Sequence, residues 1–245
     1  MILLIILHIF LELLPVSSSL LLIFFNINNK YFLHFFSGIF IFIFYFYKYF
    51  NDILRINKKL LFVIYKILLT TLPSVLVVFL KLISFKKCFI ISIINSILLL
   101  LSILLNSEDN TYVIKNLGEF DDIISYKTTL MLAFVNILSH QLQGVSRMGT
   151  YLIVLLYYKV SLVNAYIYTL ICSVPLLIGA GYMEKNLIIT TIREKYFSLI
   201  IVNIIIFLLF VKGEKYFYKY LKNILLLSII GRLIYSIIGI INLYL

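Results

Sequence analysis

The sequence predicts an all-α polytopic membrane protein made of two inverted repeats, each a re-entrant helix pair followed by three transmembrane helices. Three observations predict this fold class: an apolar composition, apolar segments long enough to cross a bilayer, and a motif that occurs twice. Of the 245 residues, 63% are hydrophobic and 13% are charged, whereas soluble domains are about 45–50% apolar. We therefore expect a lipid-facing surface and no soluble globular domain.

Six segments are apolar and poor in charge over the roughly 20 residues that a helix needs to cross a hydrocarbon core of about 30 Å. They are residues 32–50, 60–80, 88–105, 162–183, 196–211 and 223–244. We expect each to form a spanning helix. The chain, 1–245, is then one integral membrane domain, with the first repeat over 1–120 and the second over 121–245.

Two pairs of shorter apolar segments precede the two sets of three spanning helices. They are 2–14 with 16–25, and 128–143 with 148–158. Each segment is too short to span alone, Pro15 interrupts the first pair, and Gly144 breaks the second. We predict two re-entrant pairs. A cleaved signal peptide is the alternative for the first, but that stretch lacks a basic start and Glu12 interrupts its apolar core.

The net charge of +11 arises mainly from cations in short loops. Two clusters are Lys48, Arg55, Lys58 and Lys59, and then Lys212, Lys215, Lys219 and Lys222. Loop cations are typical of the cytoplasmic side of membrane proteins, so we expect no nucleic-acid partner. With these clusters inside, the N-terminus lies outside. An acidic stretch with no metal-ligand spacing is expected to be a solvated connector: Glu108, Asp109, Glu119, Asp121 and Asp122.

A helix breaker followed by Val-Ser occurs in both halves of the chain. The two strings are Leu14-Pro15-Val16-Ser17-Ser18 and Gln143-Gly144-Val145-Ser146-Arg147. Their serines lie 129 residues apart (146 − 17). Because three spanning helices separate the strings, the second copy is inverted relative to the first. In transporters with this arrangement, discontinuous helices meet near the bilayer midplane and form the binding site.

Three ionisable residues are embedded in apolar sequence: Glu12, Arg147 and Arg232. A charge at bilayer depth costs roughly 3 kcal/mol or more, so each should face a cavity or a partner. Glu12 precedes the first break and Arg147 follows the second. They form either a structural ion pair between the two breaks or part of an anion site.

Serines at both breaks favour the anion site. Ser17, Ser18 and Ser146 can cap helices that begin at the breaks, where the helix dipole is positive. The planar guanidinium of Arg147 suits phosphate oxygens. The sequence therefore predicts a phosphate cradle within the membrane.

Histidines provide further candidates near the breaks. His8 lies four residues before Glu12 and so shares its helix face, where the pair could position a proton or a divalent ion; a simple packing role for His8 is the alternative. His140 and Gln143 flank the second break and are candidates to reach the cavity. We expect His34, among phenylalanines, to be structural.

At these residues the sequence resembles the undecaprenyl pyrophosphate phosphatase family, the bacitracin-resistance membrane phosphatases, over nearly the whole chain. The family's E-x-x-x-E-F-L-P-V-S-S-T-G-H string is matched in its centre by residues 12–19, Glu-Leu-Leu-Pro-Val-Ser-Ser-Ser. Its P-G-x-S-R-S-G-x-T string is matched by Gly144-Val145-Ser146-Arg147-Met148-Gly149. Downstream, Val174-Pro175 and Arg232 also match.

Departures from the family pattern are equally specific. His8 stands in place of the family's first Glu, and Leu20-Leu21 in place of the Gly-His after the serines. Gln143 replaces a Pro, and Tyr151 replaces the Thr that ends the second motif. The chain is therefore expected to be a divergent member that lacks the family's histidine implicated in catalysis.

The resemblance implies hydrolysis of undecaprenyl pyrophosphate to undecaprenyl phosphate and inorganic phosphate, which recycles the cell-wall lipid carrier. It implies phosphate binding by Ser17, Gly144, Ser146, Arg147 and Gly149, with Arg232 and Gln143 beside them. In catalysis, Glu12 would hold Mg²⁺ or Ca²⁺ or orient the attacking group. Arg147 would be a second catalytic residue, and Ser18 would be a nucleophile or a phosphate ligand. We expect His8 to be the proton-transfer group in place of the missing histidine.

The implied location is a bacterial inner membrane, with the site opening to the outer face, the polyprenyl tail in the bilayer and a homodimer as one possible assembly. Two other functions fit an inverted repeat. One is a catalytically impaired relative that binds or translocates a polyprenyl phosphate; the other is an unrelated small-solute transporter.

Overall fold

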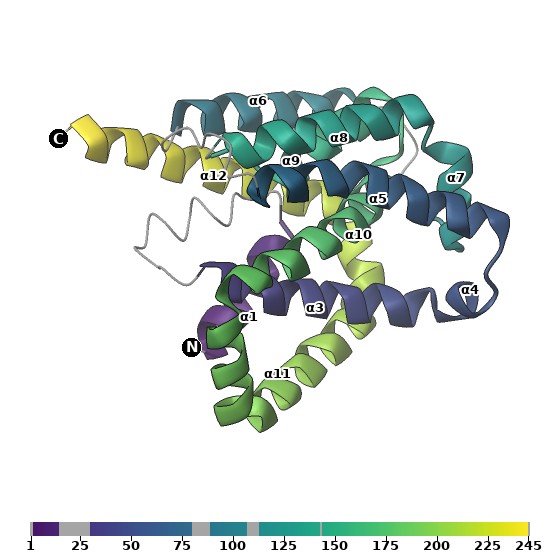
Figure 1. Ribbon diagram of the computed structural model, residues 1–245. Helices are drawn as coiled ribbons and strands as arrows, with labels where there is room; N and C mark the ends of the chain where they lie inside the picture. The colour runs from purple at the N-terminus through teal and green to yellow at the C-terminus, as the bar shows by residue number, and fades with distance from the viewer. Residues whose placement is uncertain (1, 15–29, 80–88, 107–112, 143, 245) are drawn as a thin grey trace.

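A computed structural model describes residues 2–14, 30–79, 89–106, 113–142 and 144–244, and every element in this part of the chain is a helix (Figure 1). The first half contains α1 (Ile2–Glu12), α3 (Lys30–Lys48), α4 (Phe50–Leu54), α5 (Lys58–Phe79) and α6 (Phe89–Leu105). A short link follows, η1 (Leu117–Glu119) and α7 (Phe120–Ile123). The second half contains α8 (Tyr126–Gln141), α9 (Arg147–Tyr157), α10 (Leu162–Gly181), η2 (Tyr182–Glu184), α11 (Lys185–Lys219) and α12 (Leu221–Tyr244).

The prediction of an all-helical chain is confirmed. Each of the six segments expected to span overlaps with one long helix. In chain order these helices are α3, α5, α6, α10, α11 and α12. Helices α1, α8 and α9 match three of the four shorter segments, and the fourth, 16–25, lies outside the described residues. By length and composition, two described stretches are able to cross a membrane, Leu162–Glu194, which is mostly buried, and Leu221–Asn242, which is not. Six spans therefore stay a prediction.

Side chains or proline set several helix ends. Ser146 and Ser125 precede α9 and α8, and their hydroxyls accept hydrogen bonds from the backbone N–H groups three residues later, at 3.1 Å in both cases. Asn57 does the same for Leu60 at the start of α5 (2.8 Å). These caps satisfy N–H groups that a helix leaves without partners in its first turn. The end of α1 at Glu12 agrees with the helix break that Pro15 predicts.

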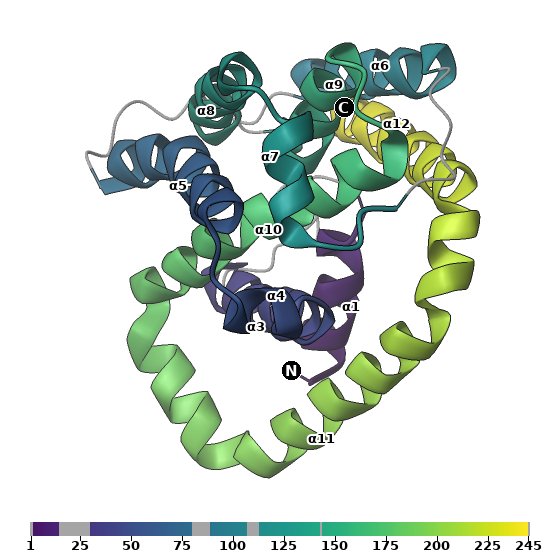
Figure 2. The ribbon, with the colours of Figure 1, turned by 90° about the vertical axis from the view of Figure 1, so that its right-hand side faces the viewer.

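Helices α3 and α10 pack along each other at the centre of the protein. Helix α5 packs on α8 and α10, α11 packs on α1 and α3, and α6 packs on α12 and α9. Figure 2 shows α11 as a long arc around the outside of α1 and α3. The central core joins both halves of the chain, so neither half encloses a separate core.

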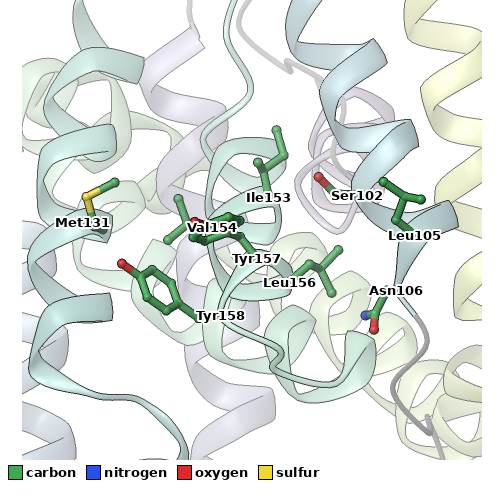
Figure 3. A pocket seen from close by; sticks show the side chains of 9 residues that line it. All are labelled: Ser102, Leu105, Asn106, Met131, Ile153, Val154, Leu156, Tyr157 and Tyr158. Carbon is green, nitrogen blue, oxygen red and sulfur yellow. The ribbon is translucent and has the colours of Figure 1, made fainter.

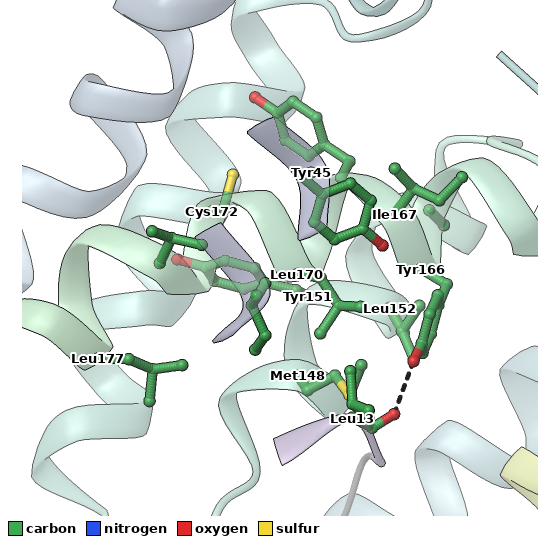
Figure 4. Close-up of a cluster of buried hydrophobic side chains, with 14 of the residues drawn as sticks. Leu13, Tyr45, Met148, Tyr151, Leu152, Tyr166, Ile167, Leu170, Cys172 and Leu177 are labelled. Atoms are coloured by element: carbon green, nitrogen blue, oxygen red, sulfur yellow. Dashed lines mark hydrogen bonds between the residues drawn. The ribbon is translucent and has the colours of Figure 1, made fainter. Parts of the chain in front are cut away.

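The end of α1 is anchored in this core (Figure 4). The Tyr166 hydroxyl, on α10, donates a hydrogen bond of 2.8 Å to the Leu13 carbonyl. That carbonyl would otherwise lack a partner at the helix end. Leu13 and Met148 belong to the same buried cluster. The first break and the start of α9 are thus parts of one packed region.

Some buried polar side chains join helices within the apolar core, and large apolar side chains line the outer faces of two helices. Between α5 and α8, the Asn136 amide donates to the Thr70 carbonyl (3.0 Å) and to the Ser74 hydroxyl (2.6 Å), and all three residues are buried. Helices α6 and α12 expose apolar residues along their outer faces: Ile90, Ile94, Ile97, Leu98, Leu101, Leu104, Leu227, Ile230, Ile234, Ile237, Ile238 and Ile241. Contiguous exposed apolar faces of this kind usually mark surfaces that contact a partner or a membrane.

The acidic connector is less solvated than predicted. Lys66, which is buried, donates to the Asp121 carboxylate (2.5 Å) and to the Ile124 carbonyl (2.6 Å), so this part of the connector is fastened to α5. Asp122 pairs with Lys59 at the exposed surface (2.7 Å), which raises the pKa of that lysine. A buried ammonium needs such partners, and the sequence pattern gave no sign that Lys66 would be buried. Glu108 and Asp109 lie outside the described residues.

Candidate functional site

His8 and Glu12 lie on one face of α1, as their spacing predicts. The His8 Nε2 atom is 3.5 Å from Glu12 Oε1. The His8 side chain is 1% exposed and the Glu12 side chain 12%, so the carboxylate retains a small opening. A histidine and a carboxylate in contact at low exposure form a candidate site for a proton or a cation.

A second histidine, His34 on α3, completes this group. Its Nδ1 atom lies 2.8 Å from Glu12 Oε1, and its ring meets the His8 ring edge to face with centroids 4.7 Å apart. We call His8, Glu12 and His34 the His-Glu cluster. The sequence interpretation of His34 as structural missed this contact. The one available signal was that His34, like His8, is an ionisable residue in an apolar helix.

Ser37 fixes the orientation of the His8 ring. Its hydroxyl donates to the Leu33 carbonyl one turn earlier (3.1 Å), and its oxygen lies 2.8 Å from His8 Nδ1. Because the single hydroxyl proton is used on Leu33, the His8 Nδ1 atom must be the donor to Ser37. In neutral His8 the Nε2 atom is then unprotonated, with its lone pair toward Glu12.

At the second break the chain turns through Gly144 into the N-terminus of α9. Gly144 has φ of 109°, a conformation that residues with a side chain rarely adopt. Ser146 caps α9 through the backbone N–H of Gly149, and Arg147 is the first residue of the helix, half-buried. This is the capped helix start with an adjacent guanidinium that the sequence predicts. Ser17, Ser18 and Gln143 lie outside the described residues.

Arg232, on α12, holds the second break in place. Its guanidinium is buried and donates to the Gly144 carbonyl (2.7 Å), to Asn95 Oδ1 (2.7 Å) and to the Ser92 hydroxyl (3.2 Å). Asn95 Oδ1 also accepts from the backbone N–H of Ser146 (3.4 Å). These bonds make Arg232 a positioning residue. The sequence had placed it beside the phosphate without assigning a role.

The sequence did not identify Asn95 as a site residue, and it did not indicate the packing contacts of Gly149. A Cβ atom on Gly149 would lie 3.2 Å from Asn95 Oδ1 and 3.3 Å from Ser146 Cβ, so the small residue lets α9 approach α6. Asn95 carries no signal in its sequence surroundings, because its partners lie in distant segments. Phosphate binding by Gly149 stays a prediction, and the structure adds that its small size is needed for packing next to the cap.

The end of α1 and the start of α9 contribute to one buried cluster, through Leu13 and Met148. The Glu12 carboxylate contacts both His8 and His34. Arg147 is the first residue of α9, next to Met148. The His-Glu cluster and the Arg147 guanidinium therefore belong to segments that meet in the same core.

An apolar hollow of about 320 Å³ begins beside this region. It is lined by Phe10, Leu13, Leu14, Ile206, Leu209, Phe210, Gly213, Phe217 and Ile224, from α1, the turn after it, α11 and α12. Leu13 and Leu14 directly follow Glu12. A hydrocarbon chain could occupy this hollow while a polar head group lies at the break.

Another hollow, of about 390 Å³, lies at the opposite end of α9 from Arg147 (Figure 3). Its lining is mainly apolar and includes Ile153, Val154, Leu156, Tyr157 and Tyr158 of α9. An 11-residue helix is roughly 16 Å long, so this hollow is remote from the α9 N-terminus. It contains none of the predicted site residues and does not contribute to the candidate site.

Comparisons with known proteins give no match to this chain, whether with protein-family models, curated proteins or solved structures.

Proposed function

We propose that this protein is a membrane lipid pyrophosphatase that hydrolyses undecaprenyl pyrophosphate to undecaprenyl phosphate and inorganic phosphate. In this role it would recycle the cell-wall lipid carrier at a bacterial inner membrane, with the site open to the outer face, and confer bacitracin resistance. The observation that carries the proposal is the His-Glu cluster at one helix break, with Arg147 at the capped helix start of the other.

The arrangement of the helices supports the inverted-repeat part of this proposal. A shift of 129 residues carries α1 onto α8, α3 onto α10, α5 onto α11 and α6 onto α12. Helix contacts follow the same correspondence: α5 on α8 corresponds to α11 on α1, and α5 on α10 to α11 on α3. The pairs α3 with α10 and α6 with α12 map onto themselves, as pairs across a two-fold axis do.

The surface supports a membrane location. The exposed apolar faces of α6 and α12 would face lipid, while buried amide and hydroxyl groups such as Asn136 and Ser74 join helices internally. Hydrogen bonds between helices are typical of membrane bundles, where burying apolar surface provides little drive for helix association. We propose six spans, of which α10 is enclosed by the others.

Each group in the region has a chemical role in this proposal. Arg147 and the N-terminus of α9 bind the phosphate oxygens and stabilise the charge that develops on them. The His8 Nε2 lone pair accepts a proton from the attacking water, whose oxygen bonds to the terminal phosphorus as the bridging P–O bond breaks. Ser17 and Ser18, which follow Glu12 in sequence, remain candidates for phosphate binding, and Ser18 for nucleophilic attack.

Glu12 is the residue that would hold a divalent cation, such as Mg²⁺ or Ca²⁺, in this proposal. When bound, the cation would offset the negative charge of the pyrophosphate. A buried carboxylate with a small opening suits this role, and the apolar hollow beside Leu13 provides a place for the start of the polyprenyl tail.

The test is phosphate release from undecaprenyl pyrophosphate by detergent-purified protein, with and without divalent cation. We expect release by the wild-type protein to require the cation and to be lost in Glu12→Ala and Arg147→Ala. Matched controls are Glu194→Ala and Arg193→Ala, which remove exposed charges of the same kinds from α11 and should leave release unchanged.

The absence of the family's Gly-His pair favours one alternative, a catalytically impaired protein that binds or translocates a polyprenyl phosphate. A folded wild-type protein that binds the lipid without releasing phosphate would establish this alternative and contradict the phosphatase. A folded protein that binds neither undecaprenyl pyrophosphate nor undecaprenyl phosphate would contradict both the phosphatase and this alternative.

A further inference from the structure

We infer that the His-Glu cluster is a site for a transition-metal ion, with Zn²⁺ as the expected ion, in place of Mg²⁺ or Ca²⁺. One ligand atom from each of His8, Glu12 and His34 lies within 4.8 Å of the other two. Two imidazole nitrogens and one carboxylate oxygen suit zinc and its neighbours, whereas Mg²⁺ and Ca²⁺ prefer oxygen ligands throughout. With the ion bound, His8 Nε2 would be a ligand, and the ion would take over from His8 the activation of the attacking water. This role in hydrolysis rests on the proposed function, but the binding of the ion is measured separately.

The distances are near those that a tetrahedral ion requires. With metal–ligand bonds of about 2.0–2.1 Å, neighbouring ligand atoms lie roughly 3.3 Å apart. The His8 Nε2 and Glu12 Oε1 atoms are 3.5 Å apart, which is already close to this value. The His34 Nδ1 atom, now 2.8 Å from the same oxygen, would have to move away by roughly 0.5 Å.

The hydrogen bonds around His8 prepare it as a ligand. Its Nδ1 atom donates to Ser37, so the neutral ring directs the lone pair of Nε2 toward Glu12. Histidines that bind metals usually donate their other nitrogen in this way, which fixes the tautomer and the ring orientation. A lone pair that faces a carboxylate oxygen in a buried place is repulsive unless a proton or a cation lies between them. A metal ion removes this repulsion.

Three protein ligands leave one position of a tetrahedral ion open. Two histidines and one glutamate with an open position are the ligand set of several zinc hydrolases. The Glu12 side chain is 12% exposed, so a fourth ligand could approach the ion through this opening. We therefore infer that the ion is there to bind a phosphate oxygen.

Metal binding is tested directly on full-length protein purified in detergent and stripped with a chelator. We expect one Zn²⁺ per chain by metal analysis, and Co²⁺ to give the absorption bands of a tetrahedral site. His8→Gln and His34→Gln should each weaken Zn²⁺ binding at least 100-fold. Cys172→Ala, which removes a buried thiol outside the cluster, should bind Zn²⁺ as the wild-type protein does.

Two results would overturn the inference: no stoichiometric Zn²⁺ or Co²⁺ binding by folded protein, or binding that survives loss of either histidine. Circular dichroism of each variant separates loss of the site from loss of the fold. Phosphate release supported by Mg²⁺ in the presence of a zinc-selective chelator would leave the phosphatase in place and contradict the zinc site. Stoichiometric zinc without phosphate release under any condition would support the site and contradict the phosphatase.

Discussion

The two helix breaks share a sequence pattern but carry different side chains. In each, a short helix ends and the sequence continues with a breaker residue and a Val-Ser pair. The first break carries a carboxylate and imidazoles, namely Glu12 with His8 on its own helix and His34 on α3. The second carries a helix cap and two guanidinium groups, from Arg147 at the start of α9 and from Arg232 on α12.

The difference is clearest at the residue that ends each short helix. Glu12 ends α1, and Gln141, the position 129 residues later, ends α8. A glutamine can hydrogen bond but cannot supply the charge of a carboxylate. Two related backbones can therefore divide the work, with proton and metal chemistry at the first break and anion binding at the second. Five substitutions test this division.

The largest expected effect is from His8→Ala at the first break. It removes the Nε2 lone pair that faces Glu12, and general-base catalysis contributes about 10²–10⁴-fold to rate. We expect phosphate release to fall about 10³-fold while the lipid still binds, because Arg147 is untouched. Parallel assays of phosphate release and lipid binding measure the two effects. Full activity in this variant would remove His8 from the mechanism.

Arg232→Leu should have the next largest effect, on stability. The substitution removes the guanidinium donor of the buried Gly144 carbonyl, and it removes one of two partners from Asn95 Oδ1 and from the Ser92 hydroxyl. An unsatisfied buried acceptor costs about 1–3 kcal/mol and a lost hydrogen bond to a charged group about 1.5–3 kcal/mol, so we expect a loss of about 3 kcal/mol after partial relaxation. Thermal unfolding in detergent measures it as a lower melting temperature.

Arg147→Leu is the matched comparison for Arg232→Leu, since both substitutions remove a guanidinium from the second break. Arg147 is half-buried at a helix start, so its loss should leave the melting temperature nearly unchanged and weaken binding of pyrophosphate. If the two variants lost the same stability, the distinction between a positioning arginine and a binding arginine would be wrong.

The sequence predicted the helices and both breaks because these depend on local signals. Apolar length located each helix, and Pro15 and Gly144 located the interruptions. The i, i+4 spacing of His8 and Glu12 predicted their contact, because a helix places such residues on one face. The resemblance and the internal repeat together predicted the capped start of α9. This cap is local, because it joins the Ser146 hydroxyl to the backbone N–H of Gly149 three residues later.

The missed contacts all depend on tertiary packing. His34 reaches Glu12 because α3 packs on α1, and Arg232 reaches Gly144 because α12 packs on α6. Nothing in the local pattern around either residue identifies its partner. Asn95 is a similar case, a polar residue in an apolar helix whose acceptor oxygen serves both Arg232 and Ser146. Such residues can be flagged by their presence in apolar segments, but their partners need the fold.

Gly144→Ala should have a moderate effect, specific to the second break. A residue with a side chain at φ of 109° is strained, and the left-handed region costs roughly 1–2 kcal/mol without glycine. We expect a melting temperature between those of the wild-type protein and Arg232→Leu, with weaker pyrophosphate binding because Ser146 and Arg147 follow directly. Gly179→Ala, on α10 with open space around its Cβ position, is the control.

The smallest effect is expected from Ser37→Ala at the first break. The change removes only the acceptor of the His8 Nδ1 proton, so His8 and Glu12 keep their places while the ring loses its fixed orientation. Groups behind a metal ligand typically contribute 10–100-fold to metal affinity, and for a single neutral hydroxyl we expect about tenfold weaker Zn²⁺ binding. Ser236→Ala removes a buried serine hydroxyl beside Ser92 at the second break and should leave the zinc affinity unchanged. Equal losses of zinc affinity in both serine variants would mean that the two breaks act as one unit, and the division of work between them would fail.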